Sequence, residues 1–414
     1  MNILVIGNGF DIAHGLPTQY RDFLRFIEVI KQIVNEEELS TIKWGNIHSQ
    51  VKKLIENNCG NVEANLYSQS DMWKNLIDEN VWIEYFLQSD MHGNENWIDF
   101  ESEISSFIQS LDYDMHGEDR DFGIYDEIGN ELSNEFLELH ERIREFEIYK
   151  EIKAVLYHDL NKLIRALELY LVEYVNKIEC VYKSPDIKEA MIERNRDETG
   201  KTKSVRLNKI LCFNYTNTFD RIYNKNSYND IDYIHGKAED AHTIETNNMV
   251  LGIDEFLPEE RQSIHTEFTE FKKFYQRIYK QTGCKYKEWI EEIREEYFSY
   301  FHKRIQKIGK ETNNIQYVIE RFPELAISSK DCKQHNVYIF GHSLDVTDRD
   351  ILRDLILNDN VYTTIFYHNR ETMGKQIVNL VKIIGEKELI KRTGGKTQTI
   401  EFKLQQAMIL DKDV

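Results

Sequence analysis

The chain has 414 residues, of which 41% are hydrophobic and 12% aromatic, and this is enough apolar material for a packed interior. Acidic residues outnumber basic ones by 72 to 52, and the formal net charge of −20 argues against broad binding to nucleic-acid phosphates, which needs a basic surface. The first residues show no secretory signal and no stretch approaches ~18 uninterrupted apolar residues, so we expect a cytoplasmic protein that does not bind membranes.

A strand, a glycine turn and a helix are predicted in succession at the start of the chain. Asn2 to Ile6 is a short apolar run typical of a buried strand, and it ends at Gly7-Asn8-Gly9. Phe10 to Gly15 is expected to form a loop before a helical pattern that begins after Pro17. In open α/β sheets such a turn holds nucleotide phosphates, because glycine lets the backbone approach the anion.

The turn departs from the dinucleotide fingerprint G-x-G-x-x-G, because Ile12 stands where the third glycine is expected. The pattern alone is therefore weak support for a dehydrogenase-type site, and the glycines would also fit a tight turn without a ligand. Asp11 favours a ligand site, because a carboxylate just beyond the carboxyl end of a strand is poorly placed for packing and well placed for binding.

Two long segments separate the strand signals. Residues 37–203 have helical spacing and are predicted to form a helical insertion. Ser184 to Ser204, at its end, is interpreted as an exposed linker that returns to the sheet. Residues 258–329 are helical and heavily charged, and are expected to be a second insertion or a lid. The predicted core domain consists of residues 1–36, 204–257 and 330–414.

Strand signals return after the first insertion and alternate with helical patterns. The predicted strands are Lys209 to Asn214, Ile231 to Ile234, Met249 to Gly252, Val337 to Phe340 and Val361 to Tyr367, with helices from about Thr347 to Leu357 and Glu371 to Gly385. We interpret Val361 to Tyr367 as the last strand of the core. This alternation predicts an α/β fold with a doubly wound, mostly parallel sheet.

Polar residues follow most of the predicted strands. They are Asn214, Tyr215 and Thr216, then His235 and Gly236, then Gly252 with Asp254, and finally Gly341, His342 and Ser343 with Asp345. Because the carboxyl ends of parallel strands meet at one edge of a sheet, we expect these residues to converge on one pocket. Each also has a structural interpretation when taken alone, since Asn214 could cap a helix and His235 could be a hydrogen-bonded turn residue.

The residue types favour some chemistries over others. The chain has no G-x-S-x-G motif and no phosphate-binding G-x-x-x-x-G-K-[ST] loop. Metal binding by His235 with Asp254 or Asp345 stays open, although no histidine spacing supports it, and the five cysteines contain no C-x-x-C pair. A histidine can take a proton from a water or a ribose hydroxyl, and the Asn214 amide can hold that group in place.

Five blocks of the chain resemble the signatures of the AbiH-type bacteriophage abortive-infection family, in order and across nearly the full length. They are GNGFDIAHGLPTQYRDF from Gly7, NWIDFESEI from Asn96, FNYTNTFD from Phe213, IHG from Ile234 and GHSLDVTDRDI from Gly341. More distantly, the chain is similar to sirtuin-like NAD-binding domains, through the first glycine turn, Gly15-Leu16-Pro17, Asn214, His235-Gly236 and the G-x-S-L turn. This resemblance implies a Rossmann-like sheet.

The resemblance to sirtuin-like domains also implies a function and a set of site residues. It implies hydrolysis of the nicotinamide-ribosyl bond of NAD(P), with NAD(P) as substrate and no tightly bound cofactor. Asn214 and His235 would cleave the bond, with Asp11 near the ribose or nicotinamide. The nucleotide would contact Gly7, Asn8, Gly9, Phe10, Thr216, Gly236, Gly341, Ser343 and Asp345. The four-cysteine zinc module of deacetylating sirtuins is absent, which disfavours protein deacetylation.

Two other functions stay open beside this one. The first is a sensing module that binds an ADP-ribose-like ligand without cleaving it and signals through the helical region. The second is a nuclease that uses Asp11, Asp254 and His235 around Mg²⁺, which the acidic charge balance disfavours. The helical insertions are candidate contacts for a homo-oligomer or a phage-derived trigger. Trp97, Asp99 and Glu101 have two open interpretations, which are helix packing with a solvated acidic face and an inhibitory contact across the mouth of the pocket.

Overall fold

The computed structural model describes residues 1–35, 39–60, 69–91, 99–116, 146–190, 192–196, 202–206, 209–224, 229–312, 334–395 and 398–410. Its centre is a sheet of six strands that all run parallel, in the spatial order β6-β5-β1-β7-β8-β9. The strands are β1 (Asn2–Ile6), β5 (Lys209–Cys212), β6 (Asp230–Tyr233), β7 (His335–Phe340), β8 (Val361–Tyr367) and β9 (Ile400–Leu404). The predicted α/β fold with a parallel sheet is confirmed.

The order of the strands creates a crevice at the middle of the sheet. From β1 the chain builds outward through β5 to β6, and it then crosses back to add β7, β8 and β9 on the other side of β1. Leu4 pairs with Ile210 on one side and with Tyr338 on the other, so β1 is central. The direction of building reverses between β1 and β7, and ligands of open α/β sheets bind at such a reversal.

Helices cover both faces of the sheet, because alternate side chains of each strand point to opposite faces. Ile3 and Val5 of β1 pack in a cluster with side chains of α17 (Arg349–Ile356), α18 (Arg370–Ile384) and α19 (Glu386–Thr393). Leu4 and Ile6 pack on the opposite face with Phe10 and with Phe219 of α11 (Thr218–Tyr223). Both faces of β1 are therefore buried, as its uninterrupted apolar sequence predicts.

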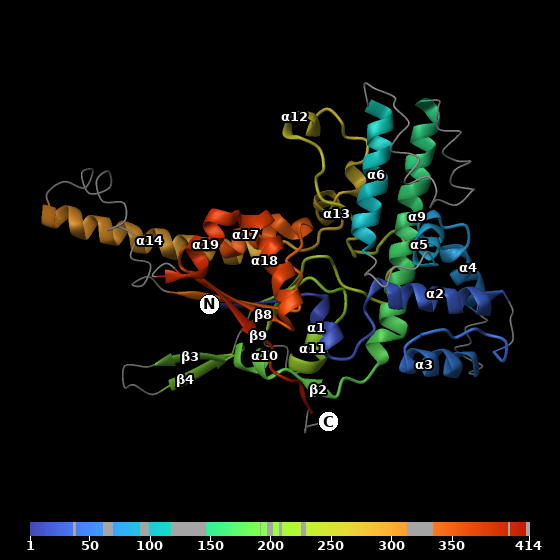
Figure 1. Cartoon of the computed structure of the whole chain (residues 1–414), viewed down its shortest axis with the longest axis horizontal. Coiled ribbons are helices and arrows are strands. Elements are labelled where there is room, and N and C mark those ends of the chain that lie inside the picture. The colour runs from blue at the N-terminus through green and yellow to red at the C-terminus, as the bar shows by residue number, and fades with distance from the viewer. Residues whose placement is uncertain are drawn as a thin grey trace.

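A third hydrophobic cluster lies in the helical part of the chain, beside the sheet (Figure 1). Its helices are α2 (Tyr20–Val34), α3 (Ser49–Gly60), α4 (Ser70–Ile77), α5 (Val81–Met91), α6 (Phe100–His116) and α9 (Phe146–Glu173). The leucines of α9 that repeat at helical spacing, such as Leu156 and Leu163, are fully buried within this cluster. The hydroxyl of Tyr170 on α9 donates to the carbonyl of Pro17 at 2.7 Å, which fixes α9 to the start of α2.

The described residues form further helices and strands. They are α1 (Asn8–Ala13), η3 (Val175–Lys177), β2 (Tyr182–Lys183), α10 (Pro185–Ala190), β3 (Ile192–Arg196), β4 (Thr202–Arg206), α12 (Glu259–Gln262), η4 (Thr269–Phe271), α13 (Lys273–Tyr279), α14 (Tyr286–Thr312), η6 (Val346–Asp348) and β10 (Ile409–Leu410). All six sheet strands fall in the ranges predicted for the core, while the division into domains stays a prediction.

The strand predicted at Met249 to Gly252 is wrong, because this segment forms no ladder with the sheet. The side chain of Gln276 takes the place of a neighbouring strand: it accepts from the Leu251 N–H at 3.1 Å and donates to the Leu251 carbonyl at 3.0 Å. Val250 donates its N–H to the carbonyl of His235 at 2.8 Å. These partners are distant in sequence and satisfy the backbone without a sheet.

Three other local predictions need correction. Phe10 to Gly15 is not wholly a loop, because α1 begins at Asn8 and ends at Ala13. The predicted linker from Ser184 to Ser204 contains α10 and the hairpin of β3 and β4, whose backbones pair with each other and so need no apolar pattern. The core also continues beyond Val361–Tyr367, since β9 is a sixth strand at the edge of the sheet.

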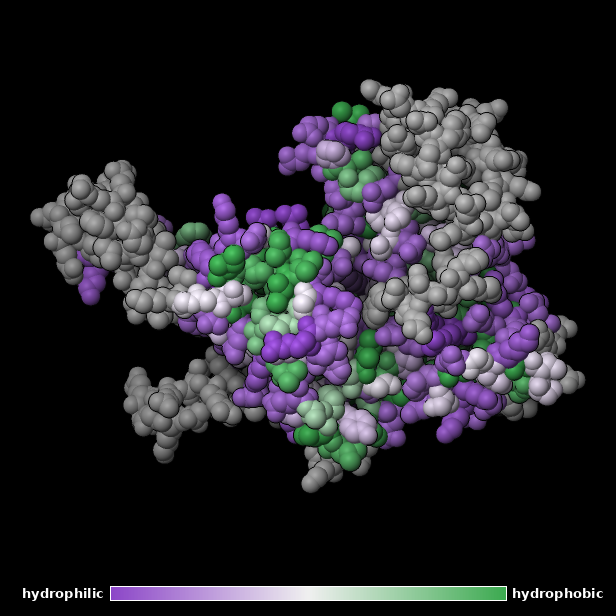
Figure 2. Space-filling model, viewed as in Figure 1, coloured by the Kyte–Doolittle hydropathy of each residue, from purple (hydrophilic) through white to green (hydrophobic). Residues whose placement is uncertain are grey.

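The surface is mostly hydrophilic on the face that Figure 2 shows, with hydrophobic side chains gathered over the region of α17 to α19. Exposed hydrophobic residues of this region are Val378, Val381 and Ile390. Among the helices of the described ranges, none is both long enough and apolar enough to span a membrane.

Candidate functional site

A cavity of about 360 Å³ lies at the carboxyl ends of the strands, where the order of the sheet reverses. This volume is within the range of small-molecule binding sites. The loops after β1, β5, β6 and β7 line it, and the helical part of the chain completes it. The lining residues from the helical part are Tyr20, Asp99, Glu101, Leu167, Leu171 and Lys273.

Glycines at the floor of the cavity let two strand-end loops touch. A Cβ atom on Gly9 would lie 2.9 Å from the Cα of Gly341, and the Gly9 N–H donates to the Gly341 carbonyl at 2.8 Å. Gly341 itself has a φ of +67°, a conformation that favours glycine. These glycines therefore have a structural reason in the packing of the β1 loop against the β7 loop.

Asp11 is buried in the cavity wall and is incompletely paired. Its Oδ2 accepts a hydrogen bond from the Thr216 hydroxyl at 2.6 Å, while Oδ1 has no partner among the described residues. Burial raises the pKa of Asp11 to about 6, against the lowering effect of Thr216, Thr218 and Asn214. The Nδ2 of Asn214 is also buried without a partner among the described residues. Both atoms are therefore free to form hydrogen bonds with a molecule in the cavity.

His235 forms a pair with Asp348 in the same cavity. Its Nε2 lies 3.1 Å from Oδ1 of Asp348, so the Nε2–H donates to the carboxylate and Nδ1 is left as the basic nitrogen. Burial lowers the pKa of His235, against the raising effect of Asp348, so the imidazole is neutral at neutral pH. An imidazole held in this tautomer by a carboxylate can act as a general base.

A second histidine supports the same carboxylate. The Nδ1 of His342 accepts the N–H of Leu344 at 2.9 Å, which places the ring proton on Nε2. That Nε2 lies 3.5 Å from Oδ2 of Asp348. Each carboxylate oxygen of Asp348 thus faces an imidazole N–H.

Lys273 brings a buried ammonium to this cluster from α13. Its Nζ lies 2.7 Å from Oε2 of Glu101, 3.3 Å from Oδ1 of Asp348 and 3.0 Å from the hydroxyl of Thr347. Burial by itself would lower the pKa of Lys273, but the carboxylates of Asp348 and Glu101 raise it well above its usual value. The lysine is therefore charged.

Asp348 and Glu101 share this one ammonium and differ in their other partners. Burial raises the pKa of Asp348, but Lys273 and His235 outweigh that effect and hold the net pKa well below its usual value. Burial raises the pKa of Glu101 to about 8, although Lys273 lowers it. When two carboxyl groups compete for one cation, the group with more hydrogen-bond donors stays ionised and the other keeps a proton.

A model of the family described as "Bacteriophage abortive infection AbiH" matches residues 3–368. The chain belongs to the AbiH family. Membership of the AbiH family gives the chain a role in abortive infection, as the sequence blocks imply. Comparisons with curated proteins and with solved structures found no match.

Ten of the twelve site residues predicted for this AbiH chain line the one cavity. They are Gly7, Asn8, Gly9, Asp11, Asn214, Thr216, His235, Gly341, Ser343 and Asp345. Phe10 does not line the cavity but packs in the core, with its ring 6.3 Å from the ring of Phe340. Gly236 does not line the cavity either, and its φ of +76° turns the chain against Asn248.

The sequence did not assign the residues that complete the cavity of this AbiH chain. Asp348 and Glu101 lie within the quoted AbiH blocks, so the motif was a signal for them, whereas Lys273 lies in a charged helical segment with no distinguishing pattern. His342 was expected in the pocket as one of the polar residues that follow the strands, and it does line the cavity. Trp97 lies outside the described residues. Within the described ranges no group of three His, Cys, Asp or Glu side chains is arranged to hold a metal ion.

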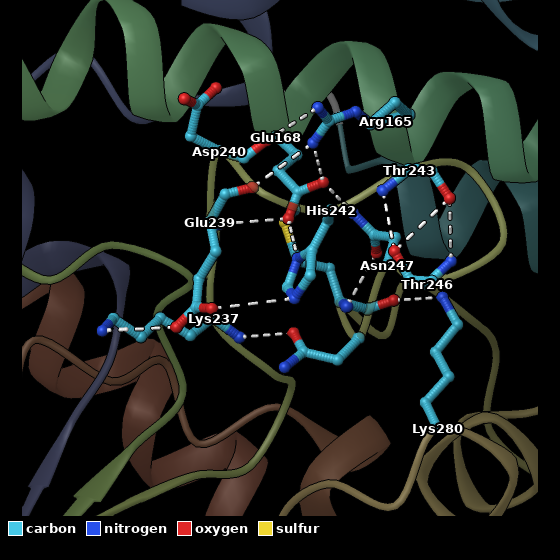
Figure 3. Close-up of polar contacts among 12 residues, drawn as sticks. Arg165, Glu168, Lys237, Glu239, Asp240, His242, Thr243, Thr246, Asn247 and Lys280 are labelled. Carbon is cyan, nitrogen blue, oxygen red and sulfur yellow. Dashed lines mark hydrogen bonds and ion pairs between the residues drawn. The ribbon is translucent and has the colours of Figure 1, made fainter.

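A separate buried cluster anchors the loop that follows His235. Glu168 of α9 accepts hydrogen bonds from Arg165, from Nδ1 of His242, from the amide of Asn247 and from the backbone N–H of Glu239 (Figure 3). Arg165 also donates to the carbonyl of Glu239 at 3.3 Å. The loop that leads away from the cavity of this AbiH chain is therefore tied to α9.

Proposed function

We propose that this AbiH protein hydrolyses the nicotinamide-ribosyl bond of NAD or a closely related nucleotide. The supporting observation is that Asp11 of α1, Asn214 after β5 and His235 after β6 line the same cavity. Removing NAD from an infected cell would deprive the phage of a cofactor needed for its replication, which agrees with a role in abortive infection.

The fold supports a nucleotide ligand. Counted along the chain, the six strands lie in the order 3-2-1-4-5-6, which is the order of Rossmann dinucleotide-binding folds. The cavity lies at the reversal of that order, where such folds bind their ligands. The resemblance to sirtuin-like domains gives the same expectation.

The charge of the lining favours a positive centre. Five carboxyl groups line the cavity together with one lysine, Lys273. Nicotinamide carries a positive charge while it is bound to ribose, and a positive oxocarbenium centre develops on the sugar as the bond breaks. Carboxylates such as Asp11 would stabilise this centre through charge.

The residues can divide the reaction between them. A water oxygen attacks C1′ of the ribose, and the electron pair of the breaking C1′–N bond leaves with nicotinamide, which becomes neutral. Nδ1 of His235 takes the proton of the water, and Asp348 stabilises the imidazolium that forms. Asn214 Nδ2 would donate to a sugar oxygen and Asp11 Oδ1 would accept from a sugar hydroxyl, so each unpaired atom gains a partner.

Incubation of the purified protein with NAD, with and without phage lysate, tests this function. Chromatography should detect nicotinamide and ADP-ribose, and Asn214→Ala and His235→Ala should each lower their formation by about 100-fold or more. His158→Ala, which changes an exposed histidine on α9, is the matched control. Full turnover in the Asn214 and His235 variants would refute the assigned roles.

The same experiment separates catalysis from sensing. Calorimetry measures the binding of NAD or ADP-ribose to the same protein. Tight binding without product, by a protein that still protects cells against phage, would favour a sensing module.

A further inference from the structure

Glu101 is placed to act on a ligand in the cavity. It lies in the first turn of α6 and lines the cavity with 13% of its side chain exposed. From the described residues, Lys273 and Thr347 both donate to the same oxygen, Oε2, at 2.7 and 3.4 Å. Oε1 is the oxygen that remains for a proton.

Burial and the neighbouring carboxylates favour the protonated form of Glu101, against the opposing effect of Lys273. Lys273 is the ammonium between Glu101 and Asp348, and Asp348 also receives an N–H from His235. The carboxyl group of Asp99 lies close enough to raise the pKa of Glu101 further. A proton on Glu101 balances the cluster, because one ammonium then faces one ionised carboxylate.

A protonated carboxyl group extends the range of bonds that the site can break. Nicotinamide leaves ribose as a neutral molecule and needs no proton. An uncharged purine base would leave as an anion unless an acid protonates a ring nitrogen. An acid beside the base His235 would therefore accelerate the release of a purine more than the release of nicotinamide.

We propose that Glu101 is a general acid and that the cavity also cleaves the N-glycosidic bond of uncharged purine nucleosides and nucleotides. This proposal rests on the proposed function, because it uses the same cavity, the same attacking water and the same base. Glu101 reaches the cavity from the first helical insertion and Lys273 from the second, so both insertions supply residues to this activity.

The proton balance of the step is complete. The water oxygen bonds to C1′, the C1′–N bond breaks, and its electron pair goes to the base. The base ring takes the proton of Glu101, while the proton of the water goes to Nδ1 of His235. A proton transfer from His235 to Glu101 through solvent then restores both groups, and Lys273 and Thr347 keep Oε2 in place.

The pH dependence distinguishes the two leaving groups. The groups that face Glu101 are Asp99, Asp348, Lys273, Tyr20 and Tyr215, and burial in their midst raises its pKa to about 8. Release of adenine should fall as the pH rises above about 8, because the acid loses its proton. Release of nicotinamide should not fall through this ionisation.

A ratio of two rates tests the proposal. Purified wild-type protein, Glu101→Gln, Glu101→Asp and Glu103→Gln are incubated with NAD, adenosine or AMP, and released nicotinamide and adenine are measured. Glu101→Gln should lower the ratio of adenine to nicotinamide release by about 100-fold. Glu101→Asp, which keeps a carboxyl group, should recover part of that ratio. Glu103 is the matched control on the same helix, where it contacts Tyr85.

The outcomes separate the two proposals. Two results would overturn the role of Glu101 and leave the NAD proposal standing. They are nicotinamide release without adenine release by the wild-type protein, and an unchanged ratio of adenine to nicotinamide release in Glu101→Gln. Adenine release without nicotinamide release would overturn the NAD proposal and support the acid. If neither base is released, both fail. Thermal melting of each variant identifies a loss of folding. If Glu101→Gln does not fold, the ratio of adenine to nicotinamide release by Glu101→Asp decides whether Glu101 is the acid.

Discussion

Two buried clusters of acidic residues show how differently one protein uses a carboxylate. Glu168 receives four hydrogen-bond donors, among them the guanidinium of Arg165, and its side chain is fully buried. In the cavity, Glu101 and Asp348 share the single ammonium of Lys273, and nearby Asp11 has an unpaired oxygen. The first cluster is complete, and the second has free hydrogen-bonding capacity.

The difference teaches where a ligand is expected. A fully paired buried network makes the fold rigid, whereas an incompletely paired one costs free energy that a ligand can recover. The two clusters are also connected in the chain, because the loop held by Glu168 begins directly after His235-Gly236. The complete cluster therefore fixes the position of the incomplete one, and variants of each should affect different properties.

The largest effect is expected for Glu168→Ala, which should lower the free energy of unfolding by about 3–5 kcal/mol. The reason is that Arg165 would stay buried without its counter-ion. Urea unfolding followed by circular dichroism measures the change. The matched control is Glu173→Ala on the same helix, an exposed pair with Lys177 that should contribute less than ~1 kcal/mol. Equal effects of the two variants would contradict the role given to Glu168.

Asp348→Asn should affect catalysis more than stability. We expect nicotinamide release to fall by about 100-fold or more, because His235 loses the carboxylate that fixes its tautomer and stabilises its charged form. Stability should fall less than in Glu168→Ala, because Glu101 can then give up its proton and become the counter-ion of Lys273, which lies 2.7 Å from it. Rate assays and urea unfolding on the same preparations check both statements. A large loss of stability with normal turnover would show that the cavity cluster is structural.

Asp11→Asn should stabilise the protein at high pH. The folded state raises the pKa of this carboxyl group from 3.8 to about 6, so the group binds its proton more tightly when folded and its ionisation opposes folding. The variant should gain up to about 3 kcal/mol at pH 8, and this gain should shrink as the pH falls from 6 to 4. Melting temperatures at pH 4 and pH 8 test the sign. A loss of stability at pH 8 would mean that Asp11 is a structural residue.

The smallest effect is expected for His242→Ala. Glu168 would keep three of its four donors, so the loss of stability should be about 1 kcal/mol. Nicotinamide release per folded molecule should change little, because His242 does not line the cavity. A large catalytic loss in this variant would show that the loop cluster takes part in the reaction.

The sequence predicted the strands that a local apolar run reveals. It failed where the backbone hydrogen-bond partners of a segment are distant in sequence. The apolar runs of β1, β7 and β8 and the polar residues after them were recognisable, because burial on both faces requires such runs. Met249 to Gly252 has the same apolar character, but its backbone pairs with the side chain of Gln276, which no local pattern reveals.

The site divides in the same way. Asn214, His235 and Asp11 could be predicted because each follows a strand, and parallel strands end at one edge. Lys273 could not be predicted, because an isolated lysine in a charged helical segment gives no sign that it is buried against two carboxylates. Phe10 was wrongly predicted to contact the nucleotide, because its helical position in α1 turns its ring into the core.

The central claim is that Asn214 and His235 bind the two sides of one sugar in this cavity. A crystal structure of the protein with an NAD analogue, whose ribose ring oxygen is replaced by a methylene group, tests it most directly. We predict that the nicotinamide ribose lies between the Asn214 amide and Nδ1 of His235, with a sugar hydroxyl on Oδ1 of Asp11. An analogue bound elsewhere on the protein, or a cavity closed by side chains when the analogue is bound, would contradict the claim.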